Sequence, residues 1–157
     1  MSAVSDRLAQ LGIVLPPVTT PAGVYVPAQR AGQFVYTSGQ LPMVDGALPV
    51  KGKLGAGVDV ETAHGLARTC ALNALAAVDA LVGLDAVAAI VKVVGFVASA
   101  PGFNAQPAVI NGASELLGAV FDGLLPTGGS HARSAVGVAE LPADSPVEVE
   151  MIVLIKE

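Results

Sequence analysis

Two segments of the chain carry apolar residues at helical spacing. In residues 61–81 the apolar side chains recur about every 3.6 residues on one stripe, and Gly83 follows the last of them. A similar stripe covers residues 106–121, where Pro107 is compatible with the first turn of a helix. The pattern therefore predicts two amphipathic helices, one over each segment.

Other segments are typical of strands, because they are rich in β-branched and aromatic residues and are bounded by turn residues. They cover 25–26, 34–37, 87–97, 133–140 and 147–155. Residues 87–97 are apolar on both faces, which favours a central strand covered on both sides. The last two segments flank a proline-containing turn at 141–146, and this arrangement predicts a closing hairpin.

The chain divides into an N-terminal extension, residues 1–20, and a single domain, residues 21–157. A short helix is predicted over 6–11, with a serine as its N-cap and Gly12 at its end. Residues 43–59 are rich in glycine and predict a loop with one short strand near 48–50.

The elements follow one another as strands, helix, strand, helix, strands. This order predicts an α+β fold in which both helices lie on one face of a mixed sheet. The opposite face would still be apolar, since the 87–97 segment has no polar side to offer to water. Contact between such faces in neighbouring copies of the chain would cover them.

The composition agrees with self-association. Apolar residues make up 53% of the 157 residues and charged residues only 13%, so a monomer would expose an unusually apolar surface. A membrane protein is the alternative, but no uninterrupted apolar run reaches about 18 residues. A soluble oligomer is therefore expected, and a cytoplasmic location follows by default. Cys70 is the single cysteine, so no intrachain disulfide is expected.

Several function classes receive no support. The net charge is −5 with eight Lys and Arg residues in all, whereas binding to a nucleic-acid backbone needs a basic stripe. The two histidines, His64 and His131, lie far apart in sequence without a nearby carboxylate pattern, so no metal site is expected. Ser130 and His131 are adjacent, and adjacent strand residues point apart, so no serine-hydrolase triad is predicted.

The strongest candidate chemistry lies near the C-terminus. Arg133 follows a loop of small residues, and Glu148 and Glu150 share one face of the last predicted strand. These charges could form a surface ion-pair network, or Arg133 could hold an anionic ligand. In a plain hairpin Arg133 would lie about 20 Å along the strand from the position opposite Glu148. A site using both would then span a boundary between two copies.

Two further polar residues have open roles. Tyr25 is either a half-buried aromatic of the sheet or part of a site. Asn111 is either a plain polar residue of its helix or a hydrogen-bonding partner for a ligand. The residues alone indicate an oligomeric α+β domain with a candidate anion pocket around Arg133.

Two motifs resemble those of the Rid family, the YjgF-like reactive intermediate deaminases, some of which carry the older labels of translation inhibitor or endoribonuclease. One runs from Ala132-Arg133-Ser134 through Leu141-Pro142 to residues 147–150. The other covers residues 35–42, with Tyr25 fourteen residues before Gly39. The resemblance extends over about residues 21–155.

The resemblance implies a chorismate-mutase-like α+β protomer. It also implies a homotrimer with pockets at the three interfaces, where small imines and enamines such as 2-iminopropanoate and 2-aminoacrylate are hydrolysed to 2-oxo acids and ammonia. Arg133 would bind the substrate carboxylate, and Glu148 would activate water and move protons. No cofactor and no metal is implied. The positions that would line the pocket are Tyr25, Ser38, Gly39, Asn111 and Ala135.

The sequence also departs from the family pattern. Ala135 stands where a cysteine is frequent, and Gly129-Ser130-His131-Ala132 replaces an aromatic-proline pair, which makes His131 a further candidate for the pocket. These differences indicate a divergent branch. The alternatives to a deaminase are a non-catalytic trimeric binder of small carboxylates or 2-oxo acids and, against the acidic charge, an RNA-cleaving or translation-inhibiting protein.

Overall fold

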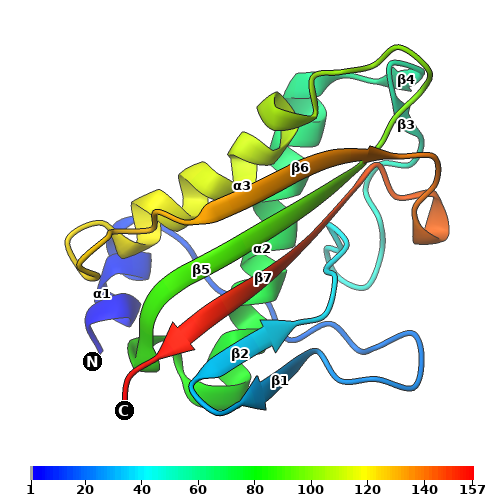
Figure 1. The fold of residues 1–157 in the computed structure, drawn as a ribbon. Helices are drawn as coiled ribbons and strands as arrows, with labels where there is room; N and C mark the ends of the chain where they lie inside the picture. The colour runs from blue at the N-terminus through cyan, green and yellow to red at the C-terminus, as the bar shows by residue number, and fades with distance from the viewer. Residues whose placement is uncertain (1) are drawn as a thin grey trace.

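The computed structural model describes residues 2–157, which form a five-stranded mixed sheet with helices on one side and a separate two-stranded pair (Figure 1). Along the chain the elements are α1 (Ala3–Gln10), β1 (Ala28–Ala31), β2 (Phe34–Thr37), β3 (Lys53–Leu54), β4 (Gly57–Val58), α2 (Val60–Val82), η1 (Leu84–Ala86), β5 (Val87–Ala98), α3 (Gln106–Phe121), β6 (Ala132–Val138), η2 (Pro142–Asp144) and β7 (Val147–Ile155). The two helices of the apolar stripes and the long strand between them lie where the sequence predicts them.

The five-stranded sheet has the order β1-β2-β7-β5-β6. β6 runs parallel to β5, while β7 runs antiparallel to both of its neighbours, β5 and β2. The predicted closing hairpin is therefore wrong, because β5 lies between β6 and β7. A parallel pair needs a crossover, and α3 supplies it between β5 and β6. The 141–146 segment then carries the chain across the end of β5 rather than back along β6.

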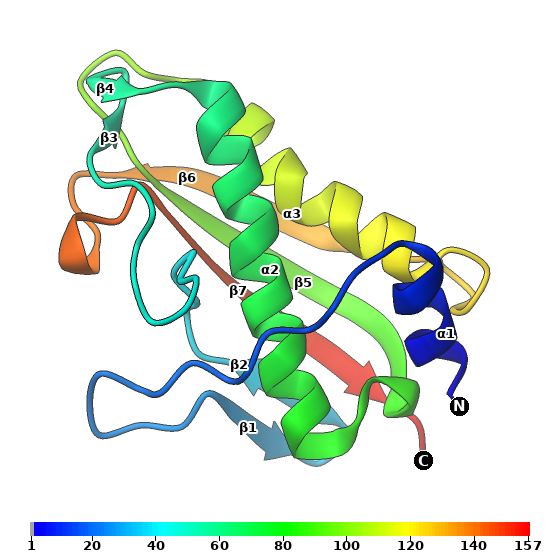
Figure 2. The same cartoon turned by 180° about the vertical axis from the view of Figure 1, so that it is seen from behind.

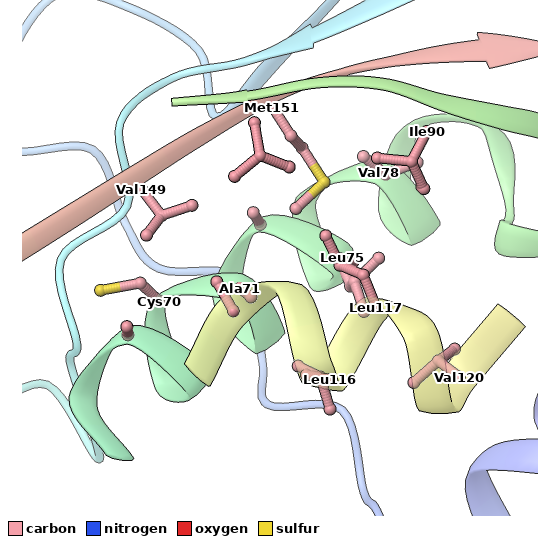
Figure 3. Close-up of a cluster of buried hydrophobic side chains, with 14 of the residues drawn as sticks. Cys70, Ala71, Leu75, Val78, Ile90, Leu116, Leu117, Val120, Val149 and Met151 are labelled. Atoms are coloured by element: carbon pink, nitrogen blue, oxygen red, sulfur yellow. The ribbon is translucent and has the colours of Figure 1, made fainter. Parts of the chain in front are cut away.

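α2 and α3 cover the same face of the sheet, as predicted (Figure 2). Between helices and sheet lies a hydrophobic core, to which both helices and strands β5 and β7 contribute (Figure 3). Cys70 is fully buried in it, and burial raises the pKa of the thiol, as does the nearby carboxylate of Glu148. This environment supports a packing role for the cysteine rather than a reactive one.

Among residues 2–157, no helix covers the other face of the sheet. Phe34, Tyr36 and Val136 expose 40%, 45% and 42% of their surface there. Ile152 and Leu154 alternate with buried residues along β7 and so share this face with Glu148 and Glu150. The result is an apolar face interrupted by the two carboxylates and by Lys92, which lies opposite Ile152 on β5.

α2 begins at the N-cap Asp59, whose side chain accepts from the Thr62 amide, and ends at Gly83 with φ 78°. By length and composition it could cross a membrane, but 56% of its most apolar window is buried inside the protein. That burial is typical of the core helix of a globular domain. The amide of Asn73 donates to the carbonyls of Leu41 and Met43 and so fixes the loop that follows β2.

Two predicted short strands are misplaced. Tyr25 and Val26 lie outside the sheet, because Pro27 has no N–H for the ladder and pairing starts one residue later, at Ala28. No strand forms at 48–50, which contains Pro49; the short pair in this loop is β3 with β4.

The N-terminal extension packs against α3. Ser2 caps α1, and Val4 and Leu8 are buried. The Arg7 guanidinium donates to the carbonyl of Ala119 and lies 3.6 Å from the Asp122 carboxylate. Helix α1 therefore secures the C-terminal end of α3.

The crossing of α2 and α3 depends on Gly112. A Cβ built there would overlap the carbonyl oxygen of His64 and lie 2.8 Å from its carbon. We expect Gly112→Ala to lower the free energy of unfolding by about 1–3 kcal/mol, because backbone on both sides must move. The matched control is Gly118→Ala in the same helix, where no atom lies within 4 Å; it should be stabilising by about 0.5–1 kcal/mol. Urea denaturation measures both, and equal effects would contradict the close-approach argument.

Candidate functional site

Arg133 lies on β6, the edge strand of the sheet, opposite Val93 of β5. Because Val93 is buried beneath the helices, the side chain of Arg133 lies on the helix-covered face, beside α3. Its NH1 donates to Oδ1 of Asn111 at 2.8 Å and to Oγ of Ser114 at 3.1 Å. Its NH2 makes a longer bond, 3.4 Å, to the carbonyl of Pro107.

These contacts leave one side of the guanidinium available. Among residues 2–157, no carboxylate lies within 4.0 Å of it, and no acceptor bonds Nε. The interpretation of Arg133, Glu148 and Glu150 as one ion-pair network is therefore wrong. Nε–H and NH2 form the side-on fork that holds a carboxylate in bidentate fashion. The arginine is oriented by neutral groups, and its Nε–H and the second N–H of NH2 have no acceptor among residues 2–157.

His131 is held next to this arginine. Its Nδ1 lies 2.7 Å from the carbonyl oxygen of Gly129, and its Nε2 lies 2.9 Å from Oγ of Ser114. The sequence analysis considered only the neighbouring Ser130 and rejected it as a partner for His131; the structure places Ser114 against the ring. Ser114 was missed because a lone serine within an apolar helix carries no signal; its spacing of three residues from Asn111 is the only hint.

A polar cleft opens at these side chains, with a volume of about 550 Å³. Helix α3 contributes one wall and the loop before β6 the other. The lining residues are Asn111, Ser114, Gly118, Asp122, Thr127, Gly128, Gly129, Ser130, His131 and Arg133. Three predicted site residues, Asn111, His131 and Arg133, thus come together in one cleft.

Glu148 belongs to a second group on the other side of the sheet. Its carboxylate lies against the backbone of Gly39, where a Cβ would overlap Oε1 and lie 2.8 Å from Cδ. Backbone bonds in both directions between Gln40 and Val149 hold the two segments together. The Glu148 carboxylate therefore fits in this position because residue 39 has no side chain.

Tyr25 and Ser38 lie on the Gly39 side. Tyr25 and Gly39 line a pocket of about 100 Å³, and Tyr25 is 51% exposed. The hydroxyl of Ser38 donates to the carbonyl of Val26 at 2.6 Å, which ties the Tyr25 loop to the end of β2. Tyr25, Ser38, Gly39 and Glu148 form the second group of predicted site residues.

The two groups do not meet within one chain. Arg133 lies in register with Val93 and, through it, with Met151 on the helix-covered face. Glu148 precedes Met151 by three residues on β7 and lies on the uncovered face. Ala135 lies between them, opposite Gly95 and partly buried against the core. The hairpin from which we expected Arg133 and Glu148 to be separated does not form. The two residues are nevertheless separated within one protomer, and each belongs to its own group of predicted site residues.

Burial raises the pKa of Glu148 above its ordinary value, and the nearby Glu150 carboxylate raises it further. A carboxyl with a higher pKa in the folded than in the unfolded chain binds protons more readily when folded. The ionisation of Glu148 therefore lowers the free energy of unfolding as the pH rises above about 4. At lower pH this carboxyl is protonated in both the folded and the unfolded chain, so it does not lower the stability.

We accordingly expect Glu148→Gln to raise the melting temperature at about pH 7.5 and to leave it unchanged at about pH 3.5, because the neutral amide lacks the penalty of a half-buried charge. Differential scanning calorimetry at the two pH values measures this. A gain of the same size at both would contradict the assignment to the carboxylate charge.

The comparisons with known proteins agree with this architecture. The family model described as Endoribonuclease L-PSP matches residues 17–155. Protein TCP17 of Trypanosoma cruzi is 42% identical over 151 residues, which cover 96% of this chain and 92% of that protein.

Two solved structures show the same fold. The protein Atu1372 of Agrobacterium tumefaciens, described as having unknown function, is 44% identical with a TM-score of 0.84, covering 97% of this chain and 91% of that chain. The YjgF gene product of E. coli is 29% identical with a TM-score of 0.62, covering 88% and 94%. The resemblance to YjgF-like proteins is confirmed, as is the chorismate-mutase-like α+β fold.

Proposed function

The chain belongs to the Endoribonuclease L-PSP family, with YjgF-like structural relatives, and from this premise we propose that it is a hydrolytic deaminase of small 2-imino acids and their enamines. The products would be 2-oxo acids and ammonia. The observation that carries the proposal is the open fork of Arg133, oriented by Asn111 and Ser114 and free of carboxylate partners among residues 2–157.

A 2-imino acid carries a carboxylate next to its electrophilic carbon. Nε and NH2 of Arg133 would bind the substrate carboxylate side-on. This contact would also fix the position of the C=N group, because the carboxylate carbon is bonded directly to the imine carbon. Imines are already electrophilic, so orientation and a proton relay suffice and no cofactor is required. Arg133 therefore acts as the substrate-binding residue in the proposal.

Glu148 supplies the proton relay. Its carboxylate takes a proton from water while the water oxygen bonds to the imine carbon, and the proton then passes to nitrogen. Glu148 then takes the hydroxyl proton of the resulting carbinolamine and passes it to nitrogen, so that the C–N bond breaks, the C=O bond forms, and ammonia leaves with three hydrogens. The raised pKa of Glu148 favours this exchange, since a group that takes and returns protons near neutral pH works best with a pKa closer to that pH.

A complete site requires two copies of the chain. One would contribute Arg133, Asn111 and His131, and the other Glu148, Gly39 and Tyr25, with Ser38 supporting the Tyr25 loop. The uncovered sheet face, with Phe34 and Tyr36 exposed, supports such an assembly, because burial of this apolar area between copies is favourable. We propose a homotrimer in which each interface forms one site.

The test is to generate 2-iminopropanoate in situ with an amino-acid oxidase and to follow its decay with and without the protein. A rate that increases in proportion to protein concentration supports the deaminase. Binding of pyruvate without any acceleration would instead favour a non-catalytic binder. An RNA-cleavage assay on the same preparation addresses the family's older label, and we expect no cleavage, given the net charge of −5.

A further inference from the structure

Ser114 and His131 form a second chemical arrangement in the polar cleft, and the proposed deaminase assigns neither of them a bond-making or proton-transfer step. The serine is on α3 and the histidine directly precedes β6, so the fold brings them together from different elements. Oγ of Ser114 lies 2.9 Å from Nε2 of His131, and Nδ1 of His131 lies 2.7 Å from the carbonyl oxygen of Gly129.

The hydrogen bonds of the pair define its direction. The Gly129 carbonyl can only accept, so Nδ1 carries the hydrogen and donates to it. In the neutral ring Nε2 is then an acceptor, and the hydroxyl group of Ser114 donates a hydrogen bond to it. The serine oxygen in turn accepts from NH1 of Arg133 at 3.1 Å. A serine that donates to an oriented imidazole is the arrangement of an activated nucleophile and its base.

The surroundings supply the remaining parts. Ser114 lines the cleft, and one turn further along α3 Gly118 leaves open space, with no atom within 4 Å of a Cβ built there. One turn before Ser114, Oδ1 of Asn111 is bonded to Arg133, while its Nδ2 has no hydrogen-bond partner among residues 2–157. That amide can donate to an oxyanion that forms above Ser114. The Nε–NH2 fork of Arg133 provides a carboxylate site next to it.

We propose that Ser114 and His131 form a nucleophile–base pair that hydrolyses small esters whose acyl group carries a free carboxylate. Arg133 binds the carboxylate, Ser114 attacks the ester carbonyl, and His131 is the general base. This activity is additional to imine hydrolysis and does not depend on it.

The reaction balances without any other reagent. Ser114 Oγ bonds to the acyl carbon and gives its proton to His131 Nε2, while the carbonyl electrons form the oxyanion. The C–O bond to the alcohol then breaks, and the alcohol leaves with the proton from His131. Water attacks the acyl-serine, again with His131 as base, and the free acid leaves as Ser114 regains its proton.

The first test uses a fluorophosphonate, which labels activated serines, followed by peptide mass spectrometry of the wild-type protein. We expect one adduct, on Ser114, with none in Ser114→Ala and labelling about 100-fold slower in His131→Ala, since a general base contributes at least that factor. Ser134→Ala is the matched control, because that residue follows Arg133 on β6 and occupies the opposite face; its labelling should equal that of wild type.

The second test compares 4-nitrophenyl hemisuccinate with neutral 4-nitrophenyl butyrate, each corrected for spontaneous hydrolysis. We expect kcat/KM to favour the charged ester by about tenfold or more, in line with one charge-assisted contact. Absence of any adduct on wild-type Ser114 would overturn the proposal, as would equal ester hydrolysis by wild type and a folded Ser114→Ala variant. Neither result bears on imine decay, which is measured separately.

Discussion

Arg133→Ala should lower kcat/KM for imine hydrolysis by about 100-fold or more. The substitution removes a bidentate, charge-assisted contact worth about 3 kcal/mol, and each 1.4 kcal/mol corresponds to about a factor of ten. The fold should survive, because the guanidinium is half-buried at a sheet edge and makes bonds only to α3 among residues 2–157.

The measurement is imine decay across a range of substrate concentrations, together with a thermal melt of each variant. Arg133→Lys keeps the charge but loses the fork, so we expect an intermediate rate. Arg30→Ala is the control; among residues 2–157 the Arg30 side chain donates only to the carbonyl of Gly32, on an exposed strand, and its loss should leave the rate unchanged. An Arg133→Ala variant as fast as wild type would remove the carboxylate-binding role from this residue.

Gly39→Ala should reduce the imine-hydrolysis rate to the level of Glu148→Gln. The added methyl group would occupy the place of the Glu148 carboxylate, which must then move away from its position. Backbone strain does not contribute, because Gly39 is not among the glycines with positive φ. The loss of activity would therefore report on the position of one carboxylate.

A double-mutant cycle isolates this effect. We expect Gly39→Ala to lower the free energy of unfolding by about 1–3 kcal/mol in the wild-type background and far less in Glu148→Ala, where the overlapping group is gone. Gly65→Ala, on α2 with open space around its Cβ, is the matched control. Additive effects of the two changes would show that Gly39 is required for a reason other than Glu148.

The elements with strong periodicity could be predicted from the sequence. The bounds of α3 and the start of β5 lie where the apolar pattern places them, because both elements are long and buried. The partners of the strands could not be predicted. The turn at 141–146 is a local signal, and it does not reveal that β7 pairs with β5 and β2, which lie far from it in sequence.

The same distinction holds for the site. Arg133 and Glu148 were found because charged residues are rare in this chain and their motifs resemble a known family. Ser114 was not, because its role depends on α3 lying beside the start of β6, a contact between segments with no shared pattern. Sequence patterns indicate which residues carry chemistry, whereas tertiary contacts determine which of them share a cleft.

The position of β7 in the sheet has a consequence for how the protein is made. Among the described strands β7 comes last along the chain and yet lies between β2 and β5, so the β1–β2 ribbon has no strand to join until β7 has been synthesised. A nascent chain that does not yet contain β7 would expose the unpaired edges of β2 and β5, to which chaperones can bind. A premature stop codon before Val147 would therefore divide the sheet into two disconnected parts.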